Sequence, residues 1–201
     1  MPAYDIAAND QDGNSESTDE MISVGESTWG SFYVGYDTYP IDAAFIWDTT
    51  SGTAVPQGVT IDTAYVTITR ESTDYSSGFT GNWYGFDVDT PDDFLTSHIH
   101  RISDHHARTT ANVVDDDWPN TATHQSPSLV SIIQEIVDRA GFSGVIGLTW
   151  RSRTTASGWF EWRDYSTSAT DVAELTVEWT AGGGGVYQGK AHPSRNALLR
   201  M

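Results

Sequence analysis

The sequence predicts an all-β fold: an antiparallel β-sandwich of the jelly-roll type, with one amphipathic helix near residues 127–140 and an extended C-terminal arm. Roughly eight segments rich in β-branched and aromatic residues are separated by Gly, Pro and Ser turns. One late segment has helical periodicity instead. With 201 residues, 38% of them hydrophobic, the chain is long enough to bury the core of a single domain.

The strands of the first half are predicted by alternation and by turn residues. They are expected, in order, over residues 21–24, 29–36, 43–47, 59–69 and 83–88. The signal is clearest over 59–69, where β-branched residues alternate with polar ones after a turn that contains Pro56 and Gly58. Alternation of this kind places one set of side chains on the core face of a sheet.

The helix is predicted from Pro127 to about Ala140. Ser126 suits the N-cap, Pro127 suits the first helical position, and Gly141 suits the C-terminal cap. Apolar residues at helical spacing predict a face that packs against the sheets: Leu129, Ile132, Ile133, Ile136 and Val137. Further strands are expected over residues 145–150, 158–162 and 174–179.

The charge divides the chain into three parts. We expect an exposed acidic segment over residues 1–20, a sandwich domain over 21–180 and a Gly-linked basic arm over 181–201. Residues 1–180 hold 28 acids and seven bases, a formal charge of −21, whereas 181–201 carries +3. The arm is expected to dock on a neighbouring acidic subunit, with a tail of no consequence as the alternative. The contact residues would be Tyr187, Lys190, Arg195, Leu198 and Leu199.

The net charge of −18 excludes several classes of partner. A non-specific nucleic-acid binder needs clustered Lys and Arg, and anionic lipid surfaces attract basic segments, so we expect neither nucleic acid nor membrane as a partner. The bases are nine Arg and the single Lys190. An Asp-rich, Lys-poor composition is similar to that of proteins from extreme halophiles, in which salt screens the repulsion. An ordinary acidic surface is the alternative.

The sequence also indicates the cellular compartment in which the chain is made. There is no cysteine, which excludes disulfides and thiolate metal sites. The N-terminal residues have neither a basic nor an apolar region of the secretory kind, and no apolar run approaches the ~20 residues of a membrane span. We therefore expect synthesis in the cytoplasm of the producing cell without a signal peptide.

Two clusters are candidates for metal binding, although we expect no resident cofactor. Carboxylates gather at Asp87, Asp89, Asp92 and Asp93, and hard oxygen ligands of this kind suit Ca²⁺. The alternative is hydrated surface, because the chain holds 20 Asp. The pair His98 and His100 would share a strand face, but two imidazoles need a third ligand. His105, His106 and His124 are the other histidines of the body, and solvated loop residues are the alternative for all five.

The remaining candidates concern sugar binding and catalysis. Trp159 and Trp162 are candidates for stacking on glycan rings, with core or interface packing as the alternative. Because they lie three apart on a strand, they face opposite sides. No Gly-x-Ser-x-Gly, phosphate-loop or His-Glu-x-x-His motif occurs, so we expect no enzymatic activity and no catalytic residues.

Five segments, taken together, resemble the pattern of a known family of jelly-roll modules. They are residues 55–66, 85–94, 108–113, 125–137 and 174–179, with Ala173 where that family usually has Pro. The family includes carbohydrate-binding modules, secreted bacterial proteins and virion proteins of tailed viruses. The resemblance covers about residues 20–180 and is specific for fold rather than function.

Together, the resemblance, the acidic composition and the basic arm lead to a functional expectation. It is a non-enzymatic virion protein of a tailed virus of a halophilic microbe, such as a capsid decoration, turret, tail or fibre component. Its partners would be other virion subunits, further copies of itself and host surface glycans. A carbohydrate-binding module or adhesin domain is the alternative. A hydrolase is a third class, testable by changing a carboxylate such as Asp87.

Overall fold

The structure is a computed structural model, which describes most of the sandwich. The residues it describes are 2–5, 7, 12–16, 21–24, 31–36, 40–75, 80–94, 104–116, 118, 122–153, 158–163, 165, 168 and 170–181.

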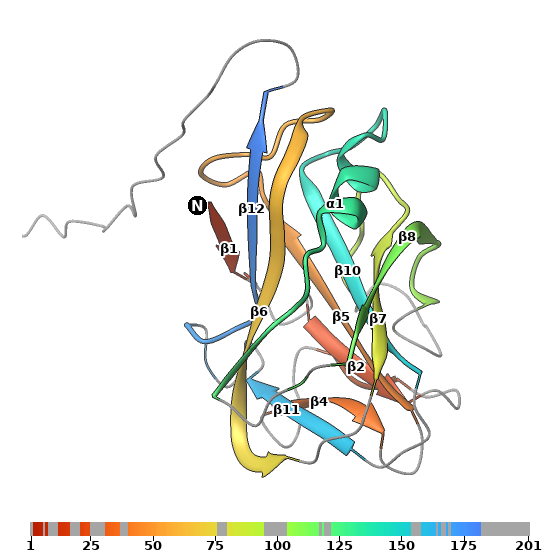
Figure 1. The fold of residues 1–201 in the computed structure, drawn as a ribbon, viewed down its shortest axis with the longest axis vertical. Helices are drawn as coiled ribbons and strands as arrows, with labels where there is room; N and C mark the ends of the chain where they lie inside the picture. The colour runs from red at the N-terminus through yellow and green to blue at the C-terminus, as the bar shows by residue number, and fades with distance from the viewer. Residues whose placement is uncertain are drawn as a thin grey trace, which may run out of the picture.

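The strands form two antiparallel sheets packed against each other (Figure 1). The first contains β1 (Ala3–Asp5), β12 (Glu174–Thr180), β6 (Thr60–Tyr75) and β9 (Thr123–Gln125), in that order. The second contains, in order, β11 (Gly158–Arg163), β4 (Ser31–Tyr36), β5 (Pro40–Asp48), β10 (Val145–Ser152), β7 (Gly81–Phe86) and β8 (Arg108–Asp115). Two further strands belong to this sheet: β2 (Asp12–Glu16) pairs with β5, and β3 (Met21–Val24) pairs with β2. The predicted all-β antiparallel sandwich is confirmed.

The long strand β6 belongs to both sheets. Its first part pairs with β12 and its last part, from Arg70, pairs with β11. The register with β12 shifts between Glu178 and Trp179, which is a β-bulge. The bulge explains why Ile61 and Ala64, three residues apart, are both buried. The alternation that predicted this strand is therefore broken once.

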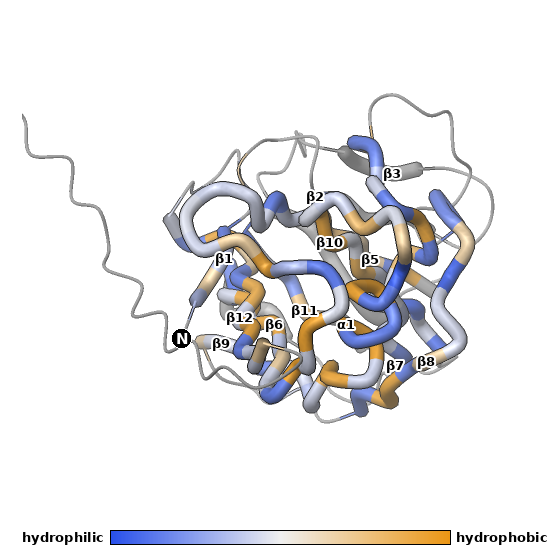
Figure 2. The backbone as a smooth tube through the Cα atoms, turned by 90° about the horizontal axis from the view of Figure 1, so that it is seen from above, coloured by the Kyte–Doolittle hydropathy of each residue, from blue (hydrophilic) through white to orange (hydrophobic). Residues whose placement is uncertain are grey.

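The core between the sheets is built around large aromatic side chains. Trp47, Trp83, Trp150 and Trp162 are all fully buried there. Phe45 lies among them, with its ring centroid 5.5 Å from that of Trp47, 6.0 Å from that of Trp83 and 5.6 Å from that of Trp162. Aromatic rings bury about 150–250 Å² each, so these residues dominate the apolar burial of the domain. Figure 2 shows the apolar stretches of β5, β10 and β12 among the strands.

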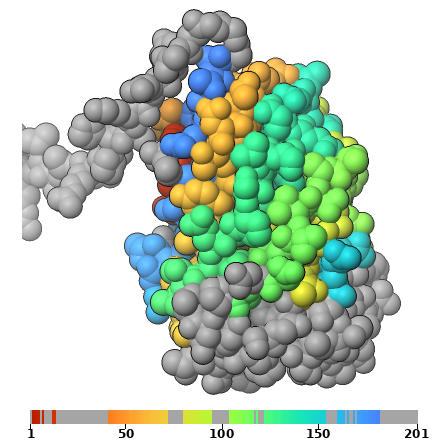
Figure 3. Space-filling view, in the orientation of Figure 1, coloured from red at the N-terminus to blue at the C-terminus, as the bar shows by residue number. Residues whose placement is uncertain are grey.

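The helix α1 (Val130–Val137) closes the space between the two sheets, because it contacts β6 on one side and β7 and β8 on the other. Figure 3 shows this segment on the face of the molecule between β6 and β8. Its apolar face is the predicted one, with Ile132, Ile133, Ile136 and Val137 buried.

The predicted bounds of the helix, 127–140, were too wide. The Ser126 amide donates to the Val66 carbonyl and the Leu129 amide donates to the Ala64 carbonyl, so this stretch extends the pairing with β6. Ser126 accepts a hydrogen bond from the Val66 amide instead of capping the helix, whose N-cap is Leu129.

The C-terminal end of the helix also differs from the prediction. The C-cap is Asp138, not Gly141. A Cβ at Gly141 would overlap the end of the half-exposed Asp89 side chain, so a larger residue there would displace that carboxylate.

The N-terminal residues were expected to be exposed, and this expectation was wrong for the strands that they contain. β1 pairs with β12, and Tyr4 is buried with its hydroxyl donating to the Thr53 carbonyl at 2.6 Å. Burial raises the pKa of Tyr4 to about 12. β2 pairs with β5, and the Asp12 side chain is fully buried. Short polar strands at the edge of a sheet carry little periodicity, which is why the pattern missed them.

Candidate metal centre

A second, smaller apolar cluster lies on the outer face of the second sheet. It contains Ala44 and Ile46 of β5 together with Phe86 and Phe94. β5 thus has both faces covered, since Ala43, Phe45 and Trp47 point into the main core. Gly147 of β10 makes room for this layer, because a Cβ there would lie 2.4 Å from the Phe86 ring.

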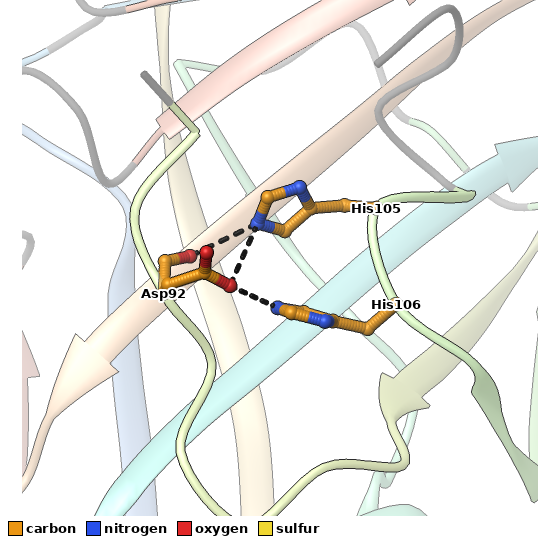
Figure 4. Close-up of side chains that lie close together, drawn as sticks. All are labelled: Asp92, His105 and His106. Carbon is orange, nitrogen blue, oxygen red and sulfur yellow. Dashed lines mark hydrogen bonds and ion pairs between the residues drawn. The ribbon is translucent and has the colours of Figure 1, made fainter. Parts of the chain in front are cut away.

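Two parts of the connection between β7 and β8 meet above this cluster and bring together three side chains of types that bind metals (Figure 4). Asp92 comes from the loop after β7, and His105 and His106 come from the residues just before β8. The Nε2 atom of His106 lies 2.9 Å from Asp92 Oδ1, and that of His105 lies 3.6 Å from the same oxygen. One oxygen atom and two imidazole nitrogens thus converge on one point.

The two imidazoles are held by aromatic packing. The Phe94 ring meets His105 edge to face at a centroid distance of 5.0 Å, and the Phe86 ring meets His106 at 5.2 Å. The side chain of His105 is 1% exposed and that of His106 is 17% exposed, whereas Asp92 is 55% exposed. The cluster therefore has an apolar floor and an open side at the carboxylate.

The electrostatics favour a neutral His106. Burial lowers its pKa, and the neighbouring His105 lowers it further, while the Asp92 carboxylate opposes both effects. A neutral imidazole is the form that binds metals.

His105 Nε2 lies 3.0 Å from the Asp92 backbone carbonyl oxygen, which can only accept, so this nitrogen carries the proton here and must give up this hydrogen bond before it can bind an ion. His106 Nε2 is buried and has no well-aligned hydrogen bond within the described part of the chain. Two imidazole nitrogens with one carboxylate form a ligand set typical of Zn²⁺ and neighbouring transition ions. Three protein ligands would leave a coordination position for water or another ligand.

The four carboxylates expected to hold Ca²⁺ do not converge. Asp87 and Asp89 both form ion pairs with Arg139, which follows α1, and the Arg139 Nε to Asp89 Oδ1 distance is 2.8 Å. In the described part of the chain, Asp92 with the two histidines is the group of three metal-binding side chains whose ligand atoms lie within 4.8 Å, and Asp93 does not belong to it. An arginine distant in sequence thus neutralises two of the four acids, and Ca²⁺ binding by these acids stays a prediction.

Other predicted site residues lie outside the description. These are His98, His100, the arm residues Tyr187, Lys190, Arg195, Leu198 and Leu199, and the side chain of Trp159. Trp162 is described and is fully buried, with its ring against Phe45. Trp162 thus takes the core-packing role that was the alternative to glycan stacking.

Sequence reasoning missed a buried polar group that joins the two sheets. Asp115 at the end of β8 contacts His124 of β9, and its Oδ2 also accepts a hydrogen bond of 2.7 Å from the Trp83 indole. The Trp118 ring stacks on His124 with centroids 3.7 Å apart. The one available signal was that Trp118 and His124 follow closely after three consecutive Asp residues in the sequence.

A shallow hollow of about 620 Å³ lies beside α1. The residues that line it are Asp87, Ser131, Gln134, Glu135, Asp138 and Arg139. Several of these groups already bond within the protein. Glu135 accepts from the amides of Thr110 and Ala111, and Gln134 bonds the backbone of Val59 and Ile61. These bonds fasten the helix to the sheets.

Comparison with models of known protein families finds no match, and comparison with curated protein sequences finds none either. Within the described residues, no helix is long and apolar enough to cross a lipid bilayer.

Proposed function

We propose that the chain is a non-enzymatic structural protein of the virion of a tailed virus that infects a halophilic microbe. It would be a capsid decoration, turret, tail or fibre component, held to neighbouring subunits by residues 181–201. The observation that carries the proposal is the division of charge. The body, residues 1–180, has a formal charge of −21, and the last 21 residues carry +3 behind four consecutive glycines.

The attachment point of the basic segment supports an anchoring role. β12 pairs with β6 along its whole length, from Glu174 to Thr180, and with β1 on its other edge. The Thr180 hydroxyl also donates to the Asp62 carboxylate at 2.8 Å. A force on residues 182–201 would therefore reach the sandwich through a strand held on both edges.

The acidic body supports the halophilic part of the proposal. A formal charge of −18 destabilises a compact chain through self-repulsion in dilute buffer. At about 1 M salt the Debye length falls to roughly 3 Å, and most of that repulsion is screened. A subunit that assembles in such salt can bring acidic bodies close together.

The experiment is removal of residues 182–201. The truncated chain should keep the far-ultraviolet circular dichroism and melting temperature of the full chain but should be missing from purified particles. A full-length control with Lys190→Gln, Arg195→Gln and Arg200→Gln separates charge from length. Truncated protein that enters particles in normal amounts would refute the anchoring role.

Carbohydrate binding is the second candidate, supported by the hollow beside α1. Carboxylate, amide and guanidinium groups are suitable partners for sugar hydroxyls. Ser131 is exposed and lines the hollow, so Ser131→Trp should block it without disturbing the core. A glycan array at high salt should show binding that Ser131→Trp removes and that Ser51→Trp, at an exposed turn, retains. Equal binding by both variants would exclude the hollow.

A further inference from the structure

We propose that Asp92, His105 and His106 bind a divalent transition ion of the Zn²⁺ class. The proposal is independent of the virion function, because it depends only on the geometry of these three side chains.

The distances between the ligand atoms suit one ion. Ligands held 2.0–2.2 Å from a tetrahedral ion lie about 3.4 Å from one another. The distances from Asp92 Oδ1 to the two Nε2 atoms, 2.9 and 3.6 Å, lie on either side of that value. All three ligand atoms lie within 4.8 Å of one another, so an ion can bind after the side chains adjust their positions.

The surroundings distinguish this cluster from an ordinary surface ion pair. The His105 side chain is almost fully buried between the Phe94 and Phe86 rings, so its orientation is fixed before any ion arrives. His106 Nε2 is a buried nitrogen without a well-aligned hydrogen bond among the described residues, although it lies close to a carboxylate. A bound ion would satisfy this nitrogen.

The donor set selects the kind of ion. Ca²⁺ and Mg²⁺ prefer six or more oxygen ligands, whereas imidazole suits Zn²⁺, Ni²⁺, Cu²⁺ and Fe²⁺. Here two of the three ligands are imidazoles. We therefore expect Zn²⁺ to bind and Ca²⁺ not to compete with it.

The ion would cross-link two segments of the chain. Asp92 and His105 lie 13 positions apart, at the two ends of the stretch that connects β7 to β8. An ion that binds the folded chain but not the unfolded chain stabilises the folded state by mass action, so binding should raise the melting temperature.

The experiment is titration of the full chain with ZnCl₂ after removal of metals by a chelator. Isothermal titration calorimetry in concentrated KCl should show one Zn²⁺ per chain and no heat with CaCl₂. His106→Gln and Asp92→Asn should each weaken Zn²⁺ binding by at least about tenfold, because each removes a ligand. Asp93→Asn is the matched control, since it changes the adjacent carboxylate outside the cluster.

Histidines elsewhere provide the decisive comparison. A His98→Gln/His100→Gln variant should retain Zn²⁺ binding. The proposal is overturned if that variant loses binding while His106→Gln retains it, or if the unmodified chain binds no Zn²⁺ stoichiometrically.

A second measurement tests the proposal on the unmodified chain, in case a variant folds poorly. Co²⁺ bound to the unmodified chain should give visible absorption bands typical of imidazole and carboxylate ligands. Zn²⁺ should then abolish these bands by competition. Bands that persist in excess Zn²⁺, or that appear unchanged in a folded His106→Gln variant, would contradict the assignment.

Discussion

His124 Nε2 lies 2.9 Å from Asp115 Oδ2, and both side chains are almost completely removed from solvent. This contact joins β9 of the first sheet to β8 of the second. The same carboxylate oxygen accepts the indole N–H of Trp83. One buried carboxylate therefore connects both sheets of the sandwich.

Asp115→Ala should lower the free energy of unfolding by about 2–6 kcal/mol. It removes the acceptor of two buried groups, at about 1–3 kcal/mol for each donor left unsatisfied. Asp115→Asn retains one side-chain oxygen, so its free energy of unfolding should lie between those of the unmodified chain and of Asp115→Ala. Denaturant unfolding at constant high salt measures the difference. Asp116→Ala, at the exposed neighbour, should change stability by less than about 0.5 kcal/mol. Equal effects of Asp115→Ala and Asp116→Ala would contradict the connecting role.

Glu174→Gln should stabilise the protein at neutral pH but not at pH 3. Glu174 of β12 lies directly opposite Asp5 of β1. Burial raises the pKa of both carboxyls, and Asp5 further raises that of Glu174. An acid whose pKa is raised in the folded state destabilises that state once ionised, so stability declines as pH rises from about 4 through the folded pKa values.

The expected gain from Glu174→Gln at pH 7 is about 0.2–1 kcal/mol, the range for cross-strand pairs. It should shrink in concentrated KCl because salt screens partly exposed charges. The measurement is urea unfolding at pH 3 and pH 7, in low and high salt. Glu178→Gln, which faces Thr63 on the same strand, is the control. A gain of the same size at pH 3 would show that charge is not the cause.

Trp162→Ala should destabilise the domain by about 3–5 kcal/mol, because it leaves a large cavity in a packed core. The exposed Val114, 48% accessible, offers a control in Val114→Ala, which should cost little. Guanidinium unfolding followed by tryptophan fluorescence measures both. An unchanged midpoint for Trp162→Ala would argue against its place in the core. Tests of glycan stacking should therefore use Trp159 alone.

Screening of the repulsion between acidic side chains should dominate the dependence of stability on salt. The variant Asp62→Asn/Asp116→Asn/Asp138→Asn removes three exposed charges and reduces the formal charge to −15. We expect it to melt about 1–3 °C above the unmodified chain at 0.1 M KCl, with the gap closing by about 2 M. Scanning calorimetry at several KCl concentrations measures the gap. A gap independent of salt would indicate that the acids do not repel one another as proposed.

Much of the fold could be predicted because strand and helix patterns are local. Residues 59–69 alternate because one face of β6 is buried, and that burial is visible in the order of residues alone. The apolar face of α1 was likewise correct. Its start was not, because residues 126–129 bond to β6, which lies some 60 positions earlier in the chain.

The candidate site could be predicted only in part. Asp92 was named with three other carboxylates as a candidate Ca²⁺ ligand, whereas the fold places it beside two histidines. The sequence places Asp87 and Asp89 beside it, whereas the fold turns those two towards Arg139. The histidines that reach Asp92 come from the far end of the same connection between β7 and β8, and no periodic pattern in the sequence places the two ends together.

The sequence by itself determined the all-β class, the acidic body and the basic C-terminal segment, because composition and residue periodicity are properties of neighbours along the chain. The tertiary structure decided which polar side chains meet. It put Asp92 beside His105 and His106, and it buried Asp115 against His124. The physical reason is that such contacts depend on how loops and sheet ends are brought together when the apolar faces are buried, and no local pattern encodes those distances.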